Sequence, residues 1–110
     1  MKNSEFEEST TFNLPDLLNY SSNTIGVKNI VVENTCVIQA FAFDFGKVQL
    51  YKKSTFSRFI YIIEGKAEVV INNNSTFMQT GDSILIPRAI SSSIEANQPF
   101  KMICTTIKID

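Results

Sequence analysis

The stretch IYIIEGKAEVVINN, residues 60–73, carries the clearest signal of fold in this chain of 110 residues. Two runs rich in β-branched and aromatic residues flank Gly65, and each run has the length of a strand. A glycine between two such runs supplies the positive φ that a tight turn or a corner needs. We therefore predict strands at residues 57–64 and 66–72, joined at Gly65 by a hairpin or a corner.

Similar runs occupy most of the chain that follows Gly26. Gly46, Gly81 and the triplet Asn72–Asn74 separate several of these runs, at places where turns are needed. No segment keeps the period of a helix over several turns. The chain is therefore predicted to be all-β, either a closed barrel or a sandwich of two sheets. Further strands are predicted at residues 27–33, 36–44, 47–53, 75–79, 82–87, 90–96 and 100–109.

The chain before Gly26 has a different character. Residues 1–12 are polar and acidic and are predicted to form a flexible N-terminal tail, which leaves residues 13–110 as a single barrel domain. At the start of that domain, NLPDLLNY predicts one helical turn that begins at Asn13 or Pro15. A single turn is stable only when it packs on the rest of the protein. We expect it to act as a lid or plug on the barrel.

The composition fits a single domain in the cytoplasm. Hydrophobic residues make up 44% of the sequence, and nine phenylalanines are enough for one core. Ten Lys and Arg balance eleven Asp and Glu, so the net charge of −1 gives no broad field for nucleic acid or an anionic membrane. No apolar run is long enough to span a bilayer, and the polar start is unlike a secretory signal. We expect a cytoplasmic protein without nucleic-acid or membrane partners.

The cysteines and the missing histidines narrow the chemistry. Cys36 and Cys104 lack the Cys-x-x-Cys spacing, and both are predicted to be buried structural thiols, with a disulfide as the lesser alternative. The sequence contains no histidine. It therefore lacks the commonest transition-metal ligand and the usual general base of nucleophilic catalysis.

Two glycines enclose a set of polar residues with regular spacing. Five residues separate Gly46 from Lys52, and Ser54 comes two positions later. Three residues then separate Ser54 from Arg58, and six separate Arg58 from Gly65. This spacing resembles the first motif of the cupin superfamily, in which a His-x-His pair and a glutamate stand between two glycines. Lys52, Ser54 and Arg58 occupy the positions of the two histidines and the glutamate.

A second stretch resembles the other cupin motif, which runs from a glycine through Pro-x-Gly to a histidine and an asparagine. Gly81 and Pro87 keep their places, while Ser92 stands at the histidine position and Ala96 at the asparagine position. The chain over residues 12–108 is similar to the small, single-domain conserved-barrel cupins of the cupin 2 type. The resemblance implies the double-stranded β-helix, or jelly-roll barrel, of the cupins.

The residues at the motif positions form the predicted site. In metal-binding cupins, three histidines and a glutamate hold a divalent ion inside the barrel. Lys52, Ser54, Arg58 and Ser92 offer cations and hydroxyls, which are poor ligands for such an ion. The resemblance therefore implies a barrel without a metal or another cofactor. We predict instead that these side chains point into the barrel mouth and bind a small anionic or sugar-like molecule.

The facing of these residues follows from strand alternation. Lys52 and Ser54 are expected to share one face, while Tyr51 and Lys53 turn to the other. In the alternative arrangement, Lys52 extends into solvent and Arg58 forms an ion pair with a carboxylate. The carboxylates considered for that pair are Glu64, Glu68 and Glu95.

Three functions remain open from the sequence. The first is non-catalytic binding of the small molecule. The second is a metal-independent isomerase or epimerase of carbohydrate metabolism, and the third is a regulatory or sensor module. No catalytic residue is assigned, because each available acid or base has a simpler structural explanation. These acids and bases are Tyr51, Tyr61, Lys52, Asp44 and Glu64.

The apolar strands also indicate that the protein associates with a second copy of itself. Residues 59–63 and the alternating Phe41, Phe43 and Phe45 supply more apolar surface than one face of a small barrel buries. A symmetric homodimer, which is common among cupins, would cover the excess. The alternative is that both apolar faces lie inside a sandwich of two sheets.

Overall fold

The computed structural model describes residues 6–108, and within that range it contains one short 3-10 turn, η1 (Leu14–Asp16), and nine strands. All the predicted strands are present, with ends that differ by a few residues, and Ile109 lies outside the described range. The strands are β1 (Ile25–Val32), β2 (Cys36–Phe43), β3 (Val48–Tyr51), β4 (Ser57–Glu64), β5 (Lys66–Ile71), β6 (Asn74–Gln79), β7 (Ser83–Ile86), β8 (Ser92–Ala96) and β9 (Phe100–Ile107).

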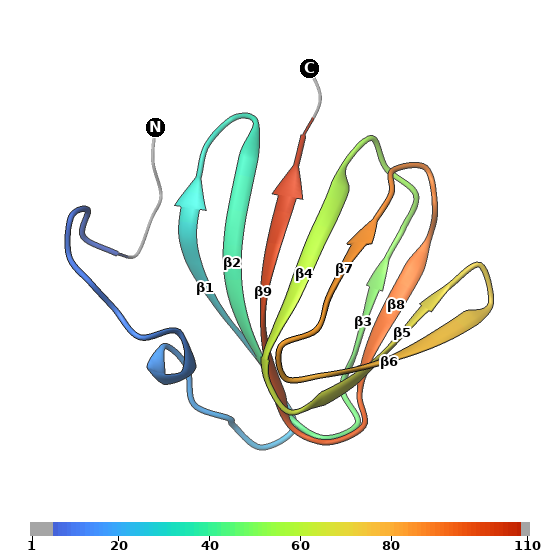
Figure 1. Ribbon diagram of the computed structural model, residues 1–110, viewed down its shortest axis with the longest axis horizontal. Coiled ribbons are helices and arrows are strands. Elements are labelled where there is room, and N and C mark those ends of the chain that lie inside the picture. The colour runs from blue at the N-terminus through green and yellow to red at the C-terminus, as the bar shows by residue number, and fades with distance from the viewer. Residues whose placement is uncertain (1–5, 109–110) are drawn as a thin grey trace.

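The strands form two antiparallel sheets that face each other. The five-stranded sheet has the order β1-β2-β9-β4-β7, and the four-stranded sheet has the order β3-β8-β5-β6. The sheets come together at the closed end, which holds the connections at residues 44–47 and 97–99 (Figure 1). They spread apart at the open end, which holds the connections at residues 33–35, 52–56 and 87–91. The prediction of an all-β jelly-roll barrel is confirmed.

Gly65 is a corner of the barrel and not a hairpin turn. Strand β4 belongs to the five-stranded sheet and β5 to the four-stranded sheet, so the chain crosses between the sheets here. Gly65 has a φ of +94°, and a Cβ atom added to it would lie 2.3 Å from the carbonyl oxygen of Pro99 and 2.7 Å from the Cα atom of Phe100. The corner therefore has room for no side chain.

The predicted asparagine turn is a hairpin. Ile71 of β5 pairs with Asn74 of β6, and the connecting residues Asn72 and Asn73 have φ values of 51° and 65°. Asparagine tolerates this left-handed region better than most residues. The two-residue loop thus fixes the register of β5 against β6.

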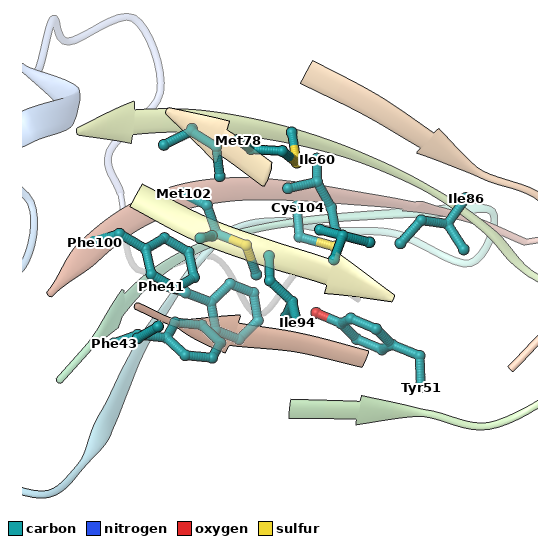
Figure 2. Close-up of a cluster of buried hydrophobic side chains, with 14 residues drawn as sticks. Phe41, Phe43, Tyr51, Ile60, Met78, Ile86, Ile94, Phe100, Met102 and Cys104 are labelled. Carbon is teal, nitrogen blue, oxygen red and sulfur yellow. The ribbon is translucent and has the colours of Figure 1, made fainter. Parts of the chain in front are cut away.

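The inward faces of both sheets fill the barrel with apolar side chains (Figure 2). At the closed end, the rings of Phe43 and Phe100 stack with their centres 4.5 Å apart. Burial of a side chain of this size stabilises the fold by about 1.5–3 kcal/mol. Cys104 is buried in this core, as predicted, whereas Cys36 is partly exposed, so the prediction of a buried thiol is wrong for Cys36; both are free thiols. The largest fully buried side chains are Phe43, Phe100, Ile60, Ile62, Ile86, Ile94, Met102, Val69 and Cys104.

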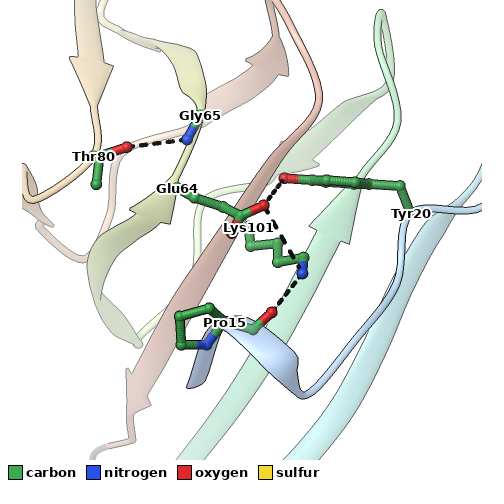
Figure 3. Close-up of polar contacts among 6 residues, drawn as sticks. All are labelled: Pro15, Tyr20, Glu64, Gly65, Thr80 and Lys101. Atoms are coloured by element: carbon green, nitrogen blue, oxygen red, sulfur yellow. Dashed lines mark hydrogen bonds and ion pairs between the residues drawn. The ribbon is translucent and has the colours of Figure 1, made fainter. Parts of the chain in front are cut away.

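The segment before β1 lies on the outside of the five-stranded sheet (Figures 1 and 3). The Lys101 ammonium donates a hydrogen bond to the carbonyl oxygen of Pro15 and lies 3.9 Å from the Glu64 carboxylate. The Tyr20 hydroxyl donates a hydrogen bond of 2.7 Å to the same carboxylate. The predicted helical turn is present as η1, but its expected role as a lid or plug is wrong, because these contacts hold it on the outer face and away from the open end.

The predicted N-terminal tail falls partly on residues 1–5, which lie outside the described residues. Within the described part, the rings of Phe6 and Phe12 stack with centres 4.6 Å apart. The division of the chain into a flexible tail and a barrel stays a prediction. No helix in the described part of the chain is long and apolar enough to cross a membrane.

Candidate functional site

The open end carries polar side chains that come from both sheets. Arg58 of β4 stands opposite Thr106 of β9, and Tyr51 of β3 stands opposite Ser92 of β8. Opposite residues on paired strands point to the same face of a sheet. Tyr51 and Ser92 are both buried, so this pair points from the four-stranded sheet into the barrel. Arg58 reaches Tyr51 from the other sheet: its guanidinium carbon lies 4.4 Å from the centre of the tyrosine ring.

A cavity of about 350 Å³ opens beside this pair. Val27, Phe41, Leu50 and Cys104 form its less polar walls. Both charged residues of the lining are cationic, and no carboxylate takes part. The cavity is therefore suited electrostatically to an anion. The polar residues of the lining are Gln39, Gln49, Tyr51, Lys52, Arg58 and Thr106.

The Arg58 side chain has no acidic partner in residues 6–108. Within these residues its guanidinium forms no ion pair and no hydrogen bond. It forms a cation–π contact with the Tyr51 ring. Glu64 instead accepts the hydrogen bond from Tyr20. The alternative expectation, an ion pair of Arg58 with Glu64, Glu68 or Glu95, is therefore wrong for the described chain.

The structure reverses the expected facing of β3. Tyr51 points into the barrel, and Lys52 is exposed at the rim of the cavity. The reason is the pairing of Tyr51 with Ser92, which places the odd-numbered residues of β3 inside and Lys52 outside. Ser54 follows the end of β3, lies outside the lining of this cavity, and accepts a hydrogen bond of 3.2 Å from the backbone N–H of Phe56.

Two buried hydroxyl groups at the open end have no hydrogen-bond partner in the described chain: those of Tyr51 and Ser92. Both residues are only 8% exposed, and the Tyr51 hydroxyl points into the core cluster (Figure 2). Burial raises the pKa of Tyr51 well above its usual value, and the nearby Cys104 thiol adds to the rise, while the Arg58 charge opposes it. Burial likewise raises the pKa of Cys104. Both groups therefore stay protonated at neutral pH.

Of the predicted site residues, Lys52 and Arg58 belong to the lining, whereas Ser54 and Ser92 do not. The residues of the lining that the motifs did not predict include Gln39, Gln49, Thr106 and Cys104. Gln39 is the polar member of an inward series that continues through Phe41 and Phe43. A single polar residue in phase with buried aromatic residues is a usable sequence signal. Thr106 and Cys104 lie two positions apart on β9 and point to the same side of the strand. The sequence pattern gives no sign that these two line a cavity, because other core residues of β9 have the same spacing.

Two antiparallel sheets closed over an apolar core, with a polar cavity at one end, define a small jelly-roll barrel. Solved structures identify this barrel as the cupin fold. The chain matches a cupin 2 conserved barrel domain protein from Leptotrichia buccalis with a TM-score of 0.92 and 23% identity, over 96% of this chain and 51% of that chain. It matches a cupin superfamily protein from Desulfitobacterium hafniense with a TM-score of 0.86 and 16% identity, over 94% of each chain.

A third match is a conserved protein of unknown function from Streptococcus pyogenes, with a TM-score of 0.87 and 19% identity over 96% of this chain and 92% of that chain. No family model matches the sequence, and no curated protein matches it. At these identities the similarity defines the fold alone. The function must therefore be argued from the residues of the site.

The side chains of the open end do not fit the divalent ion of metal-binding cupins. Arg58 and Lys52 carry positive charge and only donate hydrogen bonds, and the hydroxyls of Ser54 and Ser92 are poor ligands. No group of three or more His, Cys, Asp or Glu side chains within residues 6–108 is arranged to hold a metal. The chemistry of these donors favours an anion over a cation.

Proposed function

We propose that the protein binds a small anionic molecule in the cavity at the open end and does not transform it. The observation that carries this proposal is the state of Arg58, which is half-buried, lies against the Tyr51 ring and has no acidic partner in the described chain. Partial burial of a charge is unfavourable unless a counter-ion compensates it. An anion bound by the guanidinium, whose geometry suits carboxylates and phosphates, would supply that counter-ion.

The other predicted residues have supporting roles in this proposal. Lys52 stands at the rim, where its charge attracts an anion toward Arg58. Ser92 is not part of the cavity lining; it stands opposite Tyr51 in the strand pairing and packs beside it. Ser54 accepts the hydrogen bond of Phe56 and so shapes the loop that leads to Arg58.

The arrangement of acids and bases favours binding without turnover. Tyr51 and Cys104 keep their protons at neutral pH because burial raises the pKa of each. Tyr61 is exposed on β4, in the opposite phase to the buried Ile60 and Ile62. Asp44 and Glu64 lie at the closed end. Of the residues considered for acid–base catalysis, Tyr51 and Lys52 lie beside Arg58, but Tyr51 is protonated at neutral pH and Lys52 is exposed to water. Tyr61, Asp44 and Glu64 lie outside the cavity lining, so the isomerase alternative gains no support.

Binding can be measured directly by titration calorimetry and thermal shift with small carboxylates and sugar phosphates. We expect at least one of these anions to stabilise the wild-type protein and to lose this effect in Arg58→Gln. Arg58→Lys should retain part of the affinity, because it keeps the charge and loses the bidentate geometry. Arg88→Gln is the matched control, since Arg88 is the other arginine of the sequence and is exposed outside the cavity. Equal binding by Arg58→Gln and wild type would refute the proposal.

We also propose that the protein forms a homodimer through the outer face of the five-stranded sheet. Phe59 stands opposite Leu85 on neighbouring strands, and these side chains are 42% and 61% exposed. The outward positions of β4, β7 and β9 beside them, at residues 57–61, 83–85 and 103–107, carry no charged side chain. An uncharged apolar face of this kind complements a second copy of itself.

Light scattering at low micromolar concentration tests the dimer. We expect the mass of a dimer for the wild type and of a monomer for Leu85→Lys, which places a charge beside Phe59 on this face. Phe77→Lys is the control, because Phe77 is 70% exposed on the other sheet, where it pairs with Glu68. A monomeric wild type would exclude the dimer.

We further propose a cytoplasmic location. Cys36 and Cys104 are free thiols in the structure, and reducing compartments keep thiols in this state. Labelling of the unfolded protein directly after lysis of its native cells should find both thiols reduced. A labelling that finds either one oxidised would count against this location.

A further inference from the structure

We infer that the molecule bound at the open end is a small hydroxylated monocarboxylate, such as a hydroxy acid or a sugar acid. This inference rests on the proposed function and specifies its ligand class. Two properties of the cavity support it. The glutamines of the lining determine which hydrogen bonds a ligand can form, and Arg58 determines how much negative charge it can carry.

The first observation concerns two glutamine amides in the lining. The Gln39 amide nitrogen donates a hydrogen bond of 2.9 Å to the side-chain oxygen of Asn29, and the Gln49 amide nitrogen donates one of 3.2 Å to the carbonyl oxygen of Leu50. These bonds orient the amides through their nitrogens. The oxygen of each amide accepts no hydrogen bond in the described chain.

Amide oxygens are acceptors, so their natural partners in a ligand are hydroxyl groups. Thr106 adds a hydroxyl that donates or accepts, and its described side-chain neighbour is the Cys104 sulfur at 4.0 Å. An anion without hydroxyl groups would leave the amide oxygens of Gln39 and Gln49 without a donor inside the occupied cavity, which is unfavourable. A ligand with several hydroxyls would satisfy them.

The second observation concerns the number of charges. Arg58 is the half-buried cation of the lining, while Lys52 is exposed to water, where its interactions are screened. A carboxylate carries one negative charge, whereas a phosphate monoester carries about 1.5 to 2 at neutral pH. A dianion would leave surplus charge beside the apolar side chains of Val27 and Phe41. One carboxylate matches one guanidinium, and its two oxygens fit the fork.

The decisive experiment compares gluconate with hexanoate by titration calorimetry. The two anions share their chain length and charge and differ in the hydroxyl groups. We expect gluconate to bind wild-type protein about tenfold more tightly or better, corresponding to about 1.4 kcal/mol. Glucose tests the hydroxyls without the charge, and glucose 6-phosphate tests the dianion; both should bind more weakly than gluconate.

A substitution links the preference to the amide. Gln49→Met keeps the length of the side chain and removes its acceptor, so the affinity for gluconate should fall about tenfold while that for hexanoate stays the same. Gln79→Met is the matched control, because Gln79 is exposed on β6 and outside this cavity. It should change neither affinity.

The outcomes separate this inference from the proposed function. Equal or tighter binding of hexanoate, or tighter binding of glucose 6-phosphate, would overturn the hydroxylated monocarboxylate and leave the anion site standing. An unchanged preference for gluconate in Gln49→Met would also overturn the inference. If gluconate, hexanoate and glucose 6-phosphate all fail to bind, the anion site and its ligand class fail together.

Discussion

The closed and open ends of the barrel are built from the same strands, but they differ in what their side chains contribute. At the closed end, Phe43 and Phe100 stack 4.5 Å apart and are fully buried. At the open end, the interior holds the Arg58 guanidinium and the hydroxyls of Tyr51 and Ser92, which have no hydrogen-bond partner in the described chain. Apolar packing stabilises the fold, whereas unpaired buried polar groups weaken it.

This difference assigns separate roles to the two ends. The closed end stabilises the fold. The open end carries polar groups that reduce stability, and ligand binding explains why the protein has them. Substitutions at the closed end should therefore lower the free energy of unfolding. Substitutions that remove the polar groups of the open end should leave the free energy of unfolding nearly unchanged or raise it, and they should abolish binding.

The largest effect is expected for Gly65→Ala at the closed end. The new Cβ atom would lie 2.3 Å from the Pro99 carbonyl oxygen, and the φ of +94° adds strain for any L-residue. We expect a loss of about 4 kcal/mol or more in a urea unfolding experiment. Gly46→Ala is the control, because Gly46 has a φ of +81° and nothing within 4 Å of an added Cβ, so it should lose only about 1–2 kcal/mol. Similar losses in both variants would show that the Gly65 corner is not specially crowded.

The second effect is a loss of stability at alkaline pH that originates at the open end. Burial raises the pKa of Cys104 and of Tyr51 in the folded state, so the unfolded chain releases these protons first as the pH rises. Their contribution is complete below the ordinary thiol value of 9.0 and is lost as the pH increases beyond it. The slope should approach about 1.4 kcal/mol per pH unit for each group that titrates.

Urea unfolding measured from pH 7 upward tests this slope. Cys104→Ala should be less stable at neutral pH, because it leaves a cavity, but its stability should fall less steeply above pH 9. A slope equal to that of the wild type would mean that Cys104 does not contribute to the alkaline sensitivity.

A smaller effect of opposite sign is expected for Tyr51→Phe at the open end. The substitution removes a buried hydroxyl that has no partner in the described chain, so the free energy of unfolding should rise by about 1 kcal/mol. Tyr20→Phe is the matched comparison, because the Tyr20 hydroxyl donates a hydrogen bond to Glu64 and its loss should destabilise the protein by about 1 kcal/mol. If Tyr51→Phe destabilises the free protein, its hydroxyl has a structural partner and the contrast between the ends is weaker.

The smallest effect concerns the open-end loop after β7. Ala89 has a φ of 68°, a conformation that costs alanine about 1–2 kcal/mol and glycine almost nothing. Glycine also has more freedom in the unfolded chain, which offsets part of this gain. Ala89→Gly should therefore raise the free energy of unfolding, measured with urea, by about 0.5 kcal/mol. Asn73→Gly, at a φ of 65°, should gain less, because asparagine tolerates this region. A loss of stability in Ala89→Gly would show that the alanine methyl group is needed for packing.

The sequence predicted the strands well because their patterns are local. The run on each side of Gly65 has the composition of a strand. The break at the glycine can be recognised without knowing which strands the two runs pair with. The side-chain phase of β3 could not be predicted in the same way. Motif spacing places Lys52 correctly along the chain, but the pairing of Tyr51 with Ser92, far apart in sequence, decides which residue faces inward.

The position of the N-terminal segment was also beyond a sequence argument. A single helical turn carries no information about the surface on which it packs. Its placement depends on Lys101, which holds the Pro15 carbonyl oxygen from the outer face of β9. Likewise, Gln39 and Gln49 become site residues only because the two sheets bring β2 and β3 to opposite walls of one cavity.

The central position of β9 has a consequence for synthesis of the protein. Strand β9 lies between β2 and β4 and pairs with both along most of its length. The five-stranded sheet therefore cannot close until residues 100–107 have left the ribosome. Before that moment, the edges of β2 and β4 that pair with β9 lack their hydrogen-bond partners and are open to aggregation. A ribosome-bound chain that stalls before Phe100 should consequently be a substrate for chaperones, whereas release of the full strand should allow rapid closure of the sheet.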